Sequence, residues 1–112
     1  MSITSAEVGV DVSEADLAHL EMAPSIAVKP PRVKRSPVAF ECKYVKTVEL
    51  PATDGKANPY SIVIGQVIGI YIADEVIIDG KVDLTSARAI ARLGGLDQYT
   101  SVDHVFKMKR PG

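Results

Sequence analysis

One run of twelve residues, SIVIGQVIGIYI from Ser61 to Ile72, constrains this chain more than any other stretch. As a strand it places apolar side chains on both faces, and neither face is suited to water. Isoleucine loses side-chain freedom in a helix and packs well on a pleated surface, so a strand is favoured. At about 3.3 Å per residue the strand is about 40 Å long, and we expect it to bend at Gly65 or Gly69. We favour a strand that packs on the core with one face and on a subunit or helix with the other. The alternative is a strand that lines a ligand site.

Composition excludes several classes of function. A chain of 112 residues, 46% hydrophobic and 24% charged, suits at most one globular domain, and its net charge of -1 gives no reason to expect nucleic-acid or membrane binding. Cys42 is the only cysteine, so no internal disulfide forms, and no cluster of His and Cys has metal-ligand spacing. The N-terminus lacks a secretory pattern, and no apolar run reaches the length of a membrane span. We therefore expect a cytoplasmic protein without a metal site.

The first third of the chain predicts a short helix followed by an extended connection. Ser13 is a candidate N-cap, and residues 14–21 have the narrow apolar face of a short helix. Four prolines make residues 23–37 an extended connection, because proline disfavours helix interiors and central strands. The cations of this connection are Lys29, Arg32, Lys34 and Arg35. A solvated connector is favoured over a phosphate-binding segment, because few aromatic residues lie among these cations.

Residues 38–50 show the cleanest alternation of apolar and polar side chains, which predicts a half-buried antiparallel strand. Cys42 lies on its apolar side, so we interpret it as a small core residue rather than a nucleophile. Residues 51–60 read as a long hairpin loop, so this strand should pair antiparallel with the strand at 61–72. Further along the chain, the pair Asp79 and Gly80 predicts a tight turn between two short strands.

The last third predicts a second short helix and a closing strand. Residues 85–92 have a helical apolar side, and Gly94 with Gly95 ends it; the alternative is that these glycines let a ligand approach closely. Residues 99–108 form the last strand, in which His104 is interpreted as a packed or edge residue rather than a general base. Four or five strands with two short helices suggest part of a β-barrel, whose open edges need to be covered.

The order of several motifs resembles the flavin reductase-like, FMN-binding split-barrel family. These motifs are VKPPRV (28–33), SPVAFEC (36–42), VIGQVIGIYI (63–72), DEVIIDGKVD (74–83) and ARLGG (91–95) followed by Tyr99. The resemblance covers nearly the whole chain and implies a mainly β fold, namely a partial split β-barrel of antiparallel strands with two short helices. It also implies that residues 1–112 form the C-terminal portion of such a domain, without its N-terminal strands.

The resemblance further implies a flavin site. Members of the family are typically homodimers that bind FMN near the subunit interface and pass hydride from NADH or NADPH through the flavin to an acceptor. Carried over residue by residue, Arg92, Gly94, Gly95 and Tyr99 match the family pattern near the flavin. Tyr71 stands where the family often has histidine, so it keeps a hydroxyl donor but lacks a base that titrates near neutrality. No catalytic residue is assigned.

Three hypotheses of different classes follow. The first is an FMN-binding oxidoreductase of flavin reductase type, for which the absence of a catalytic triad is no objection because the flavin carries the hydride. The second is a noncatalytic β-barrel remnant that dimerises through its unpaired strand edges and binds no flavin. The third is nucleic-acid binding through residues 29–35, which the lack of net positive charge disfavours.

Overall fold

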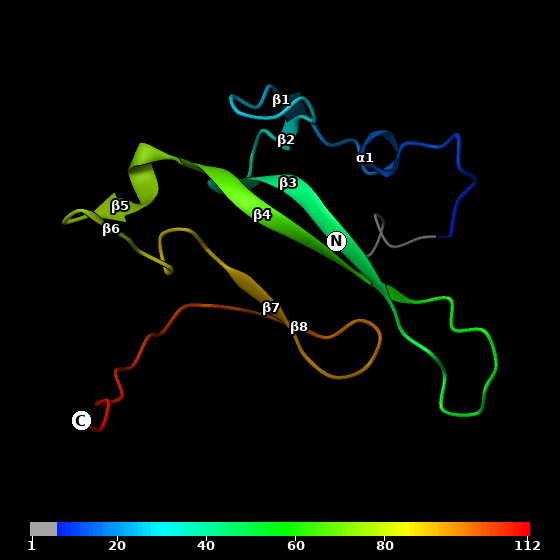
Figure 1. The fold of residues 1–112 in the computed structure, drawn as a ribbon. Helices are drawn as coiled ribbons and strands as arrows, with labels where there is room; N and C mark the ends of the chain where they lie inside the picture. The colour runs from blue at the N-terminus through cyan, green and yellow to red at the C-terminus, as the bar shows by residue number, and fades with distance from the viewer. Residues whose placement is uncertain (1–6) are drawn as a thin grey trace. The chain divides into compact units, whose positions relative to one another are not determined.

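A computed structural model describes residues 7–112 of the chain. The chain divides into two compact units, one made of Met1–Glu21 with Ile72–Gly112 and the other of Met22–Tyr71. Most of the regular secondary structure of both units is antiparallel strand, with few helical residues (Figure 1). The expected mainly β fold is therefore confirmed, and each unit is described by itself below.

The longest elements are two strands of equal length in the Met22–Tyr71 unit. Strand β3 spans Val38–Glu49 and strand β4 spans Ser61–Ile72, and the two form a two-stranded sheet. Both strands were predicted from the sequence, β4 with the same bounds. Residues 50–60 contain no strand and join β3 to β4, which confirms the predicted loop.

Two glycines of β4 let residues of β3 approach closely. A Cβ atom on Gly65 would lie 3.3 Å from the Cβ of Cys42, and one on Gly69 would lie 3.4 Å from the Cβ of Glu41. From Glu41 to Cys42 the chain of β3 therefore runs in the direction opposite to that of β4 from Gly65 to Gly69, as in an antiparallel pair.

The proline-rich connection contains a small ribbon that the sequence did not predict. Strand β1, Met22–Ala23, pairs antiparallel with strand β2, Arg32–Val33. The pairing brings both ends of residues 24–31 together, so this segment forms a closed loop. The strands are only two residues long because prolines at 24, 30 and 31 lack the amide hydrogen that a ladder requires.

The predicted N-terminal helix is shorter than expected. Helix α1 spans Glu14–Leu17, and Ser13 is its N-cap, with the Asp16 amide donating to Ser13 Oγ at 3.4 Å. The cap was predicted, whereas the extension to residue 21 was wrong. The helix stops because His19 has a φ of 52°, which lies in the left-handed region.

The other unit contains two short hairpins, of which the first follows a 3₁₀ turn. The turn η2 spans Asp74–Val76, strand β5 spans Ile77–Ile78 and strand β6 spans Lys81–Val82. Asp79 and Gly80 connect the strands with φ values of 52° and 73°, as a type I′ turn requires. The predicted tight turn is confirmed.

The second hairpin replaces the helix predicted for residues 85–92. Residues 84–88 form turns only, and strand β7 begins soon after, at Ile90–Arg92. It pairs antiparallel with strand β8, Tyr99–Ser101. The helix prediction was wrong because Arg88 has a φ of 51°, which ends the helical turn. Pairing with β8 then fixes the following residues as strand.

Two further expectations for this region need correction. Gly94 and Gly95 lie in the turn between β7 and β8 rather than at a helix end. The last strand ends at Ser101 instead of Met108, and residues 102–112 contain no regular structure. A strand requires a hydrogen-bonded neighbour, and β7 is only three residues long.

Few side chains of residues 7–112 are fully buried. The buried apolar residues are Ala73 and Val76, and the buried polar residue is Glu41. Most large side chains of β3 and β4 are exposed instead: Phe40, Tyr44, Val45, Ile62, Val63, Ile64, Val67, Ile68 and Ile70. Both faces of β4 are apolar, as predicted. That core packs on one face and a subunit or helix on the other stays a prediction.

Candidate functional site

The β7–β8 hairpin holds four of the five residues that were predicted to bind the cofactor. These residues are Arg92, Gly94, Gly95 and Tyr99. Arg92 and Tyr99 face each other as the last pair of the ladder. Directly beyond this pair the amide of Leu93 donates to the carbonyl oxygen of Gln98 at 2.9 Å, which closes the turn.

The turn presents hydrogen-bond donors without partners. Gly95 has a φ of +73°, which favours glycine, whereas a Cβ on Gly94 would meet only Gln98 Oε1, at 3.9 Å. Both glycines are exposed residues, and their amides make no hydrogen bond within residues 7–112. Arg92 Nη2 donates to the carbonyl oxygen of Leu96 at 3.4 Å, so the guanidinium also contacts this turn.

This donor set fits part of a flavin nucleotide. A guanidinium and neighbouring amides bind phosphate oxygens or ring carbonyl oxygens, and both groups occur in flavins. Two exposed leucines, Leu93 and Leu96, supply apolar surface next to the donors, and Tyr99 adds a half-buried phenol. The hairpin therefore suits oxygen recognition, and its turn also carries one carboxylate, Asp97.

Tyr71, the fifth predicted residue, belongs to the other unit. The Arg32 guanidinium lies over its ring, with the Cζ atom 3.6 Å from the ring centroid, so one face of the phenol ring is covered. Arg32 Nη1 is buried and has no hydrogen-bond partner within residues 7–112. For Arg32 the expected solvated connector is therefore wrong, because this side chain packs against β4.

Glu41 on β3 holds the proline-rich loop. Its Oε1 accepts from the amide of Ile26 and its Oε2 from the amide of Ala27, both at 2.7 Å. The residue is only 6% exposed. The two amides hold the pKa of Glu41 below its ordinary value, with help from the Ser25 hydroxyl and the Arg32 charge, while burial opposes the shift.

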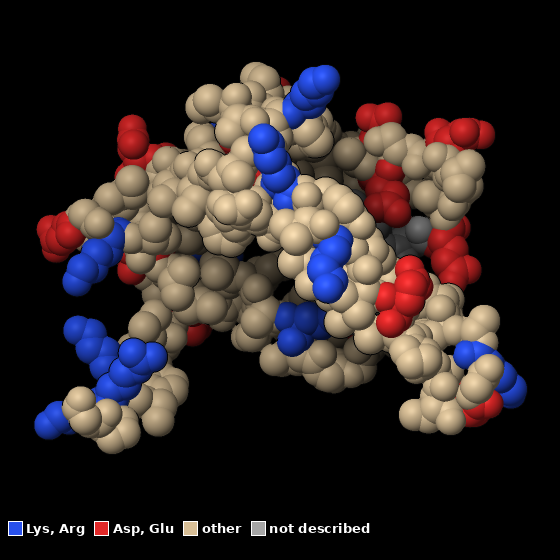
Figure 2. Space-filling model, viewed as in Figure 1, with Lys and Arg blue, Asp and Glu red and all other residues tan. Residues whose placement is uncertain are grey.

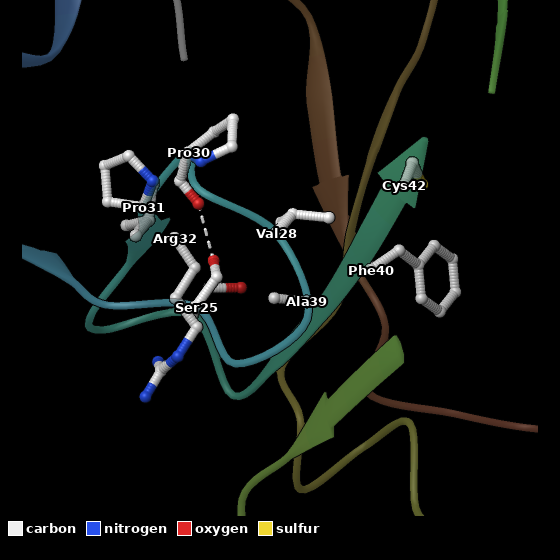
Figure 3. A pocket seen from close by; sticks show the side chains of 10 residues that line it. Ser25, Val28, Pro30, Pro31, Arg32, Ala39, Phe40 and Cys42 are labelled. Atoms are coloured by element: carbon white, nitrogen blue, oxygen red, sulfur yellow. Dashed lines mark hydrogen bonds between the residues drawn. The ribbon is translucent and has the colours of Figure 1, made fainter. Parts of the chain in front are cut away.

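A groove of about 280 Å³ lies between this loop and the start of β3 (Figure 3). Its lining is mostly apolar and consists of Ser25, Val28, Pro30, Pro31, Arg32, Val33, Ser36, Ala39, Phe40 and Cys42. The Ser25 hydroxyl donates to the Pro30 carbonyl oxygen at 2.6 Å, so it is already engaged. In Figure 3 the Arg32 guanidinium points away from Pro30 and Val28. The groove thus lacks a charged group aimed into it.

Sequence reasoning missed the contacts of Glu41 and Arg32. The alternation of β3 placed Glu41 with the polar side chains, which normally face solvent. Gly69 was the available signal, because an interior strand glycine often marks the close approach of another group. A Cβ there would lie 2.8 Å from Glu41 Oε2, so the glycine leaves room for the carboxylate.

Neither a membrane helix nor a metal cluster is found in the described part of the chain. Among residues 7–112, no helix has the length and apolar character needed to cross a membrane. In the same residues, no group of three or more His, Cys, Asp or Glu side chains is placed to hold a metal ion.

Comparison with curated proteins finds relatives about twice as long. No protein-family model matches the chain. An uncharacterized protein of Deinococcus radiodurans is 26% identical over 113 residues, which cover 98% of this chain and 47% of that protein. One of Halalkalibacterium halodurans is 27% identical, covering 99% and 52%, and one of Aquifex aeolicus is 34% identical, covering 85% and 45%. The chain spans about half the length of the curated relatives it matches.

Solved structures give the clearest likeness. Nitrilotriacetate monooxygenase component B from Bacillus cereus matches 95% of this chain and 52% of its own, with a TM-score of 0.82 and 24% identity. A protein named a flavin reductase with a split-barrel domain, from Shewanella frigidimarina, matches 96% and 52%, with a TM-score of 0.74 and 29% identity. The 2-nitrobenzoate 2-nitroreductase NbaA of Pseudomonas fluorescens matches 92% and 50%, with a TM-score of 0.73 and 24% identity. The chain has a split-barrel fold of flavin reductase type.

Proposed function

We propose that residues 1–112 are the C-terminal portion of an FMN-binding oxidoreductase of flavin reductase type. The observation that carries this proposal is the match of 96% of the chain to the Shewanella flavin reductase at 29% identity. The donor-rich β7–β8 turn adds chemical support, because its residues suit the oxygen atoms of a flavin nucleotide.

Within this proposal the hairpin binds and orients the cofactor. Arg92 and the amides of Gly94 and Gly95 hold oxygen atoms of the cofactor, and Tyr99 packs beside them. Tyr71 stays a predicted cofactor-binding residue in the other unit, where Arg32 covers one face of its ring. The flavin, when bound, accepts a hydride and passes it on, so these residues contribute binding and electrostatics rather than proton transfer.

NADH or NADPH is the proposed hydride donor, and a small molecule is the acceptor. We also propose that the protein is cytoplasmic and a homodimer that binds neither nucleic acid nor membrane. Two of the matched structures are named as a monooxygenase component and a nitroreductase, and both names describe redox proteins. The names thus support redox chemistry in general.

A flavin titration tests the proposal. The polypeptide that carries this chain together with the remaining half of a split barrel should purify yellow and oxidise NADH or NADPH in an FMN-dependent way. Arg92→Ala should raise the FMN dissociation constant roughly tenfold, the value of a charge-assisted hydrogen bond. Arg35→Ala, which removes an exposed arginine from the other unit, is the matched control and should have no effect. A colourless protein indifferent to FMN would refute the proposal.

One observation favours a second candidate, a noncatalytic β-barrel remnant. Large apolar side chains on β3 and β4 are exposed, and within residues 7–112 the β3–β4 sheet has two strands, so both of its edges are unpaired there. Such a remnant should form oligomers in light scattering and show no flavin spectrum after FMN is added. A stable monomer would count against it.

A further inference from the structure

The first described residues form an acidic segment, which we define as residues 7–21. Its carboxylates are Glu7, Asp11, Glu14, Asp16 and Glu21, and no lysine or arginine precedes Lys29. Its apolar side chains are exposed as well: Val10 is fully exposed, and Val12 and Leu17 are nearly half exposed. The segment thus combines negative charge with unpacked apolar surface.

The last residues have the opposite character, and we define residues 102–112 as the C-terminal arm. Its cations are Lys107, Lys109 and Arg110, against a single acidic residue, Asp103. Phe106 is 73% exposed and Met108 is 82% exposed. The arm contains no strand or helix and runs out from the β7–β8 hairpin as a coil (Figure 1).

The acidic segment and the C-terminal arm belong to the same unit but do not neutralise each other. Within residues 7–112, no ion pair involves the carboxylates of Asp11, Glu14 or Asp16 or the cations of the arm. Acidic side chains gather at the upper right of Figure 2, over the N-terminal part of the chain, whereas basic side chains cluster at the chain end at the lower left. Asp11, Glu14, Asp16 and the cations of the arm are therefore available to another molecule.

We propose that the C-terminal arm of one copy docks on the acidic segment of a second copy. Each copy carries one arm and one acidic segment, so a two-fold arrangement satisfies both arms at once. The charges are complementary, and each side brings exposed apolar residues that the contact buries, Phe106 and Met108 on the arm and Val12 and Leu17 on the segment. A second copy accounts for both surfaces, because an unrelated acidic partner would bind the arm but leave the acidic segment without a partner.

The strength of the contact depends on salt. Exposed ion pairs each contribute about 1 kcal/mol or less in water and weaken as salt screens them. Three cations facing several carboxylates therefore change the dimer dissociation constant appreciably, while Phe106 and Met108 keep part of the contact at high salt. Association through this surface is thus weakened, but not abolished, by salt.

Sedimentation of charge-reversed variants is the first test. The triple variant K107E/K109E/R110E should raise the dimer dissociation constant at least roughly tenfold at about 50 mM NaCl and less at about 500 mM. K43E/K46E/K81E is the matched control, because it changes the net charge equally at exposed positions elsewhere and should leave the constant unchanged. The side chains of Lys107, Lys109 and Arg110 make no hydrogen bond or ion pair within residues 7–112, so circular dichroism should show unchanged folding.

A charge swap makes the test specific. The variant D11K/E14K/D16K should also dimerise more weakly alone, whereas mixing it with K107E/K109E/R110E should restore a dimer through one matched pair of surfaces. Carbodiimide cross-linking of an equal mixture of isotopically light and heavy wild-type chains should join Lys107 or Lys109 to Asp11 or Glu14 in mixed light–heavy peptides.

Three outcomes would overturn the inference: a monomer under all conditions, a dimer insensitive to arm reversal, or cross-links within one chain only. None of them bears on FMN binding, which the Arg92→Ala titration tests separately.

Discussion

Gly69 faces the Glu41 carboxylate at a distance that leaves no space for a side chain. A methyl group there would lie 2.8 Å from Glu41 Oε2 and 3.4 Å from the Cβ of Ala27. The carboxylate cannot move aside freely, because both of its oxygens accept amide hydrogen bonds. Gly69→Ala should therefore lower the free energy of unfolding by about 1–3 kcal/mol, measured by urea denaturation.

Gly9→Ala is the matched control for this substitution, because a Cβ at Gly9 meets nothing within 4 Å. Its free energy of unfolding should stay within about 0.5 kcal/mol of wild type. If Glu41 is the obstacle, Gly69→Ala should cost less in a Glu41→Ala background than in the wild type. An equal cost in both backgrounds would contradict the steric explanation.

The pKa of Glu41 predicts how stability depends on pH. Amides of Ile26 and Ala27 lower the folded-state pKa below the ordinary value of 4.5. A depressed carboxyl pKa stabilises the fold above the unfolded-state pKa, and this contribution is lost as pH falls through the folded-state pKa. Urea midpoints of wild type and Glu41→Gln should therefore differ at about pH 7 and converge toward about pH 3. A difference that does not shrink in acid would show that ionisation of Glu41 is unimportant.

Residue types alone did not reveal these contacts. Glu41 and Arg32 are charged, and charged residues are usually solvated, so the sequence placed both at the surface. Their partners are backbone amides and the face of an aromatic ring, contributed by segments distant in sequence. The glycines of β4 were noticed, but their spacing does not say which group approaches them.

At the level of elements, prediction succeeded where the signal was local. The bounds of β4 follow from twelve β-prone residues, and the 79–80 turn follows from an Asp-Gly pair that accepts positive φ. Ser13 was identified as an N-cap from its hydroxyl next to an acidic first turn. In each case the residues that cause the structure lie within a few positions of it.

Prediction failed where pairing across the sequence decides the structure. Residues 85–92 have a helical pattern, yet Ile90–Arg92 pairs with Tyr99–Ser101 as a strand. The β1–β2 ribbon is likewise fixed by a contact between segments about ten residues apart. The predicted site shows the same division. Four of its residues come from one local motif and lie in one hairpin, whereas Tyr71 lies in the other unit.

At the scale of the whole molecule, the exposed faces of the β3–β4 sheet are the main feature to explain. Val63 is 66% exposed and Ile70 is 59% exposed, although both lie in the most hydrophobic strand of the chain. The matched solved structures contain this fold as about half of their chains. Covering strands from the other half would bury these side chains and pair the free edges.

Ile68→Asp on β4 distinguishes a covered face from a solvent face. Ile68 is 40% exposed, so in this chain alone the substitution should change the urea midpoint little. In the polypeptide completed by the other half of a split barrel, an unpaired carboxylate under covering strands should cost several kcal/mol, roughly 3 or more, and weaken FMN binding. Tyr60→Asp, at a residue 74% exposed in the loop before β4, should be neutral in both forms. An equally small effect of Ile68→Asp in both forms would mean that β4 faces water, and the split-barrel assembly would then need another explanation for its apolar strand.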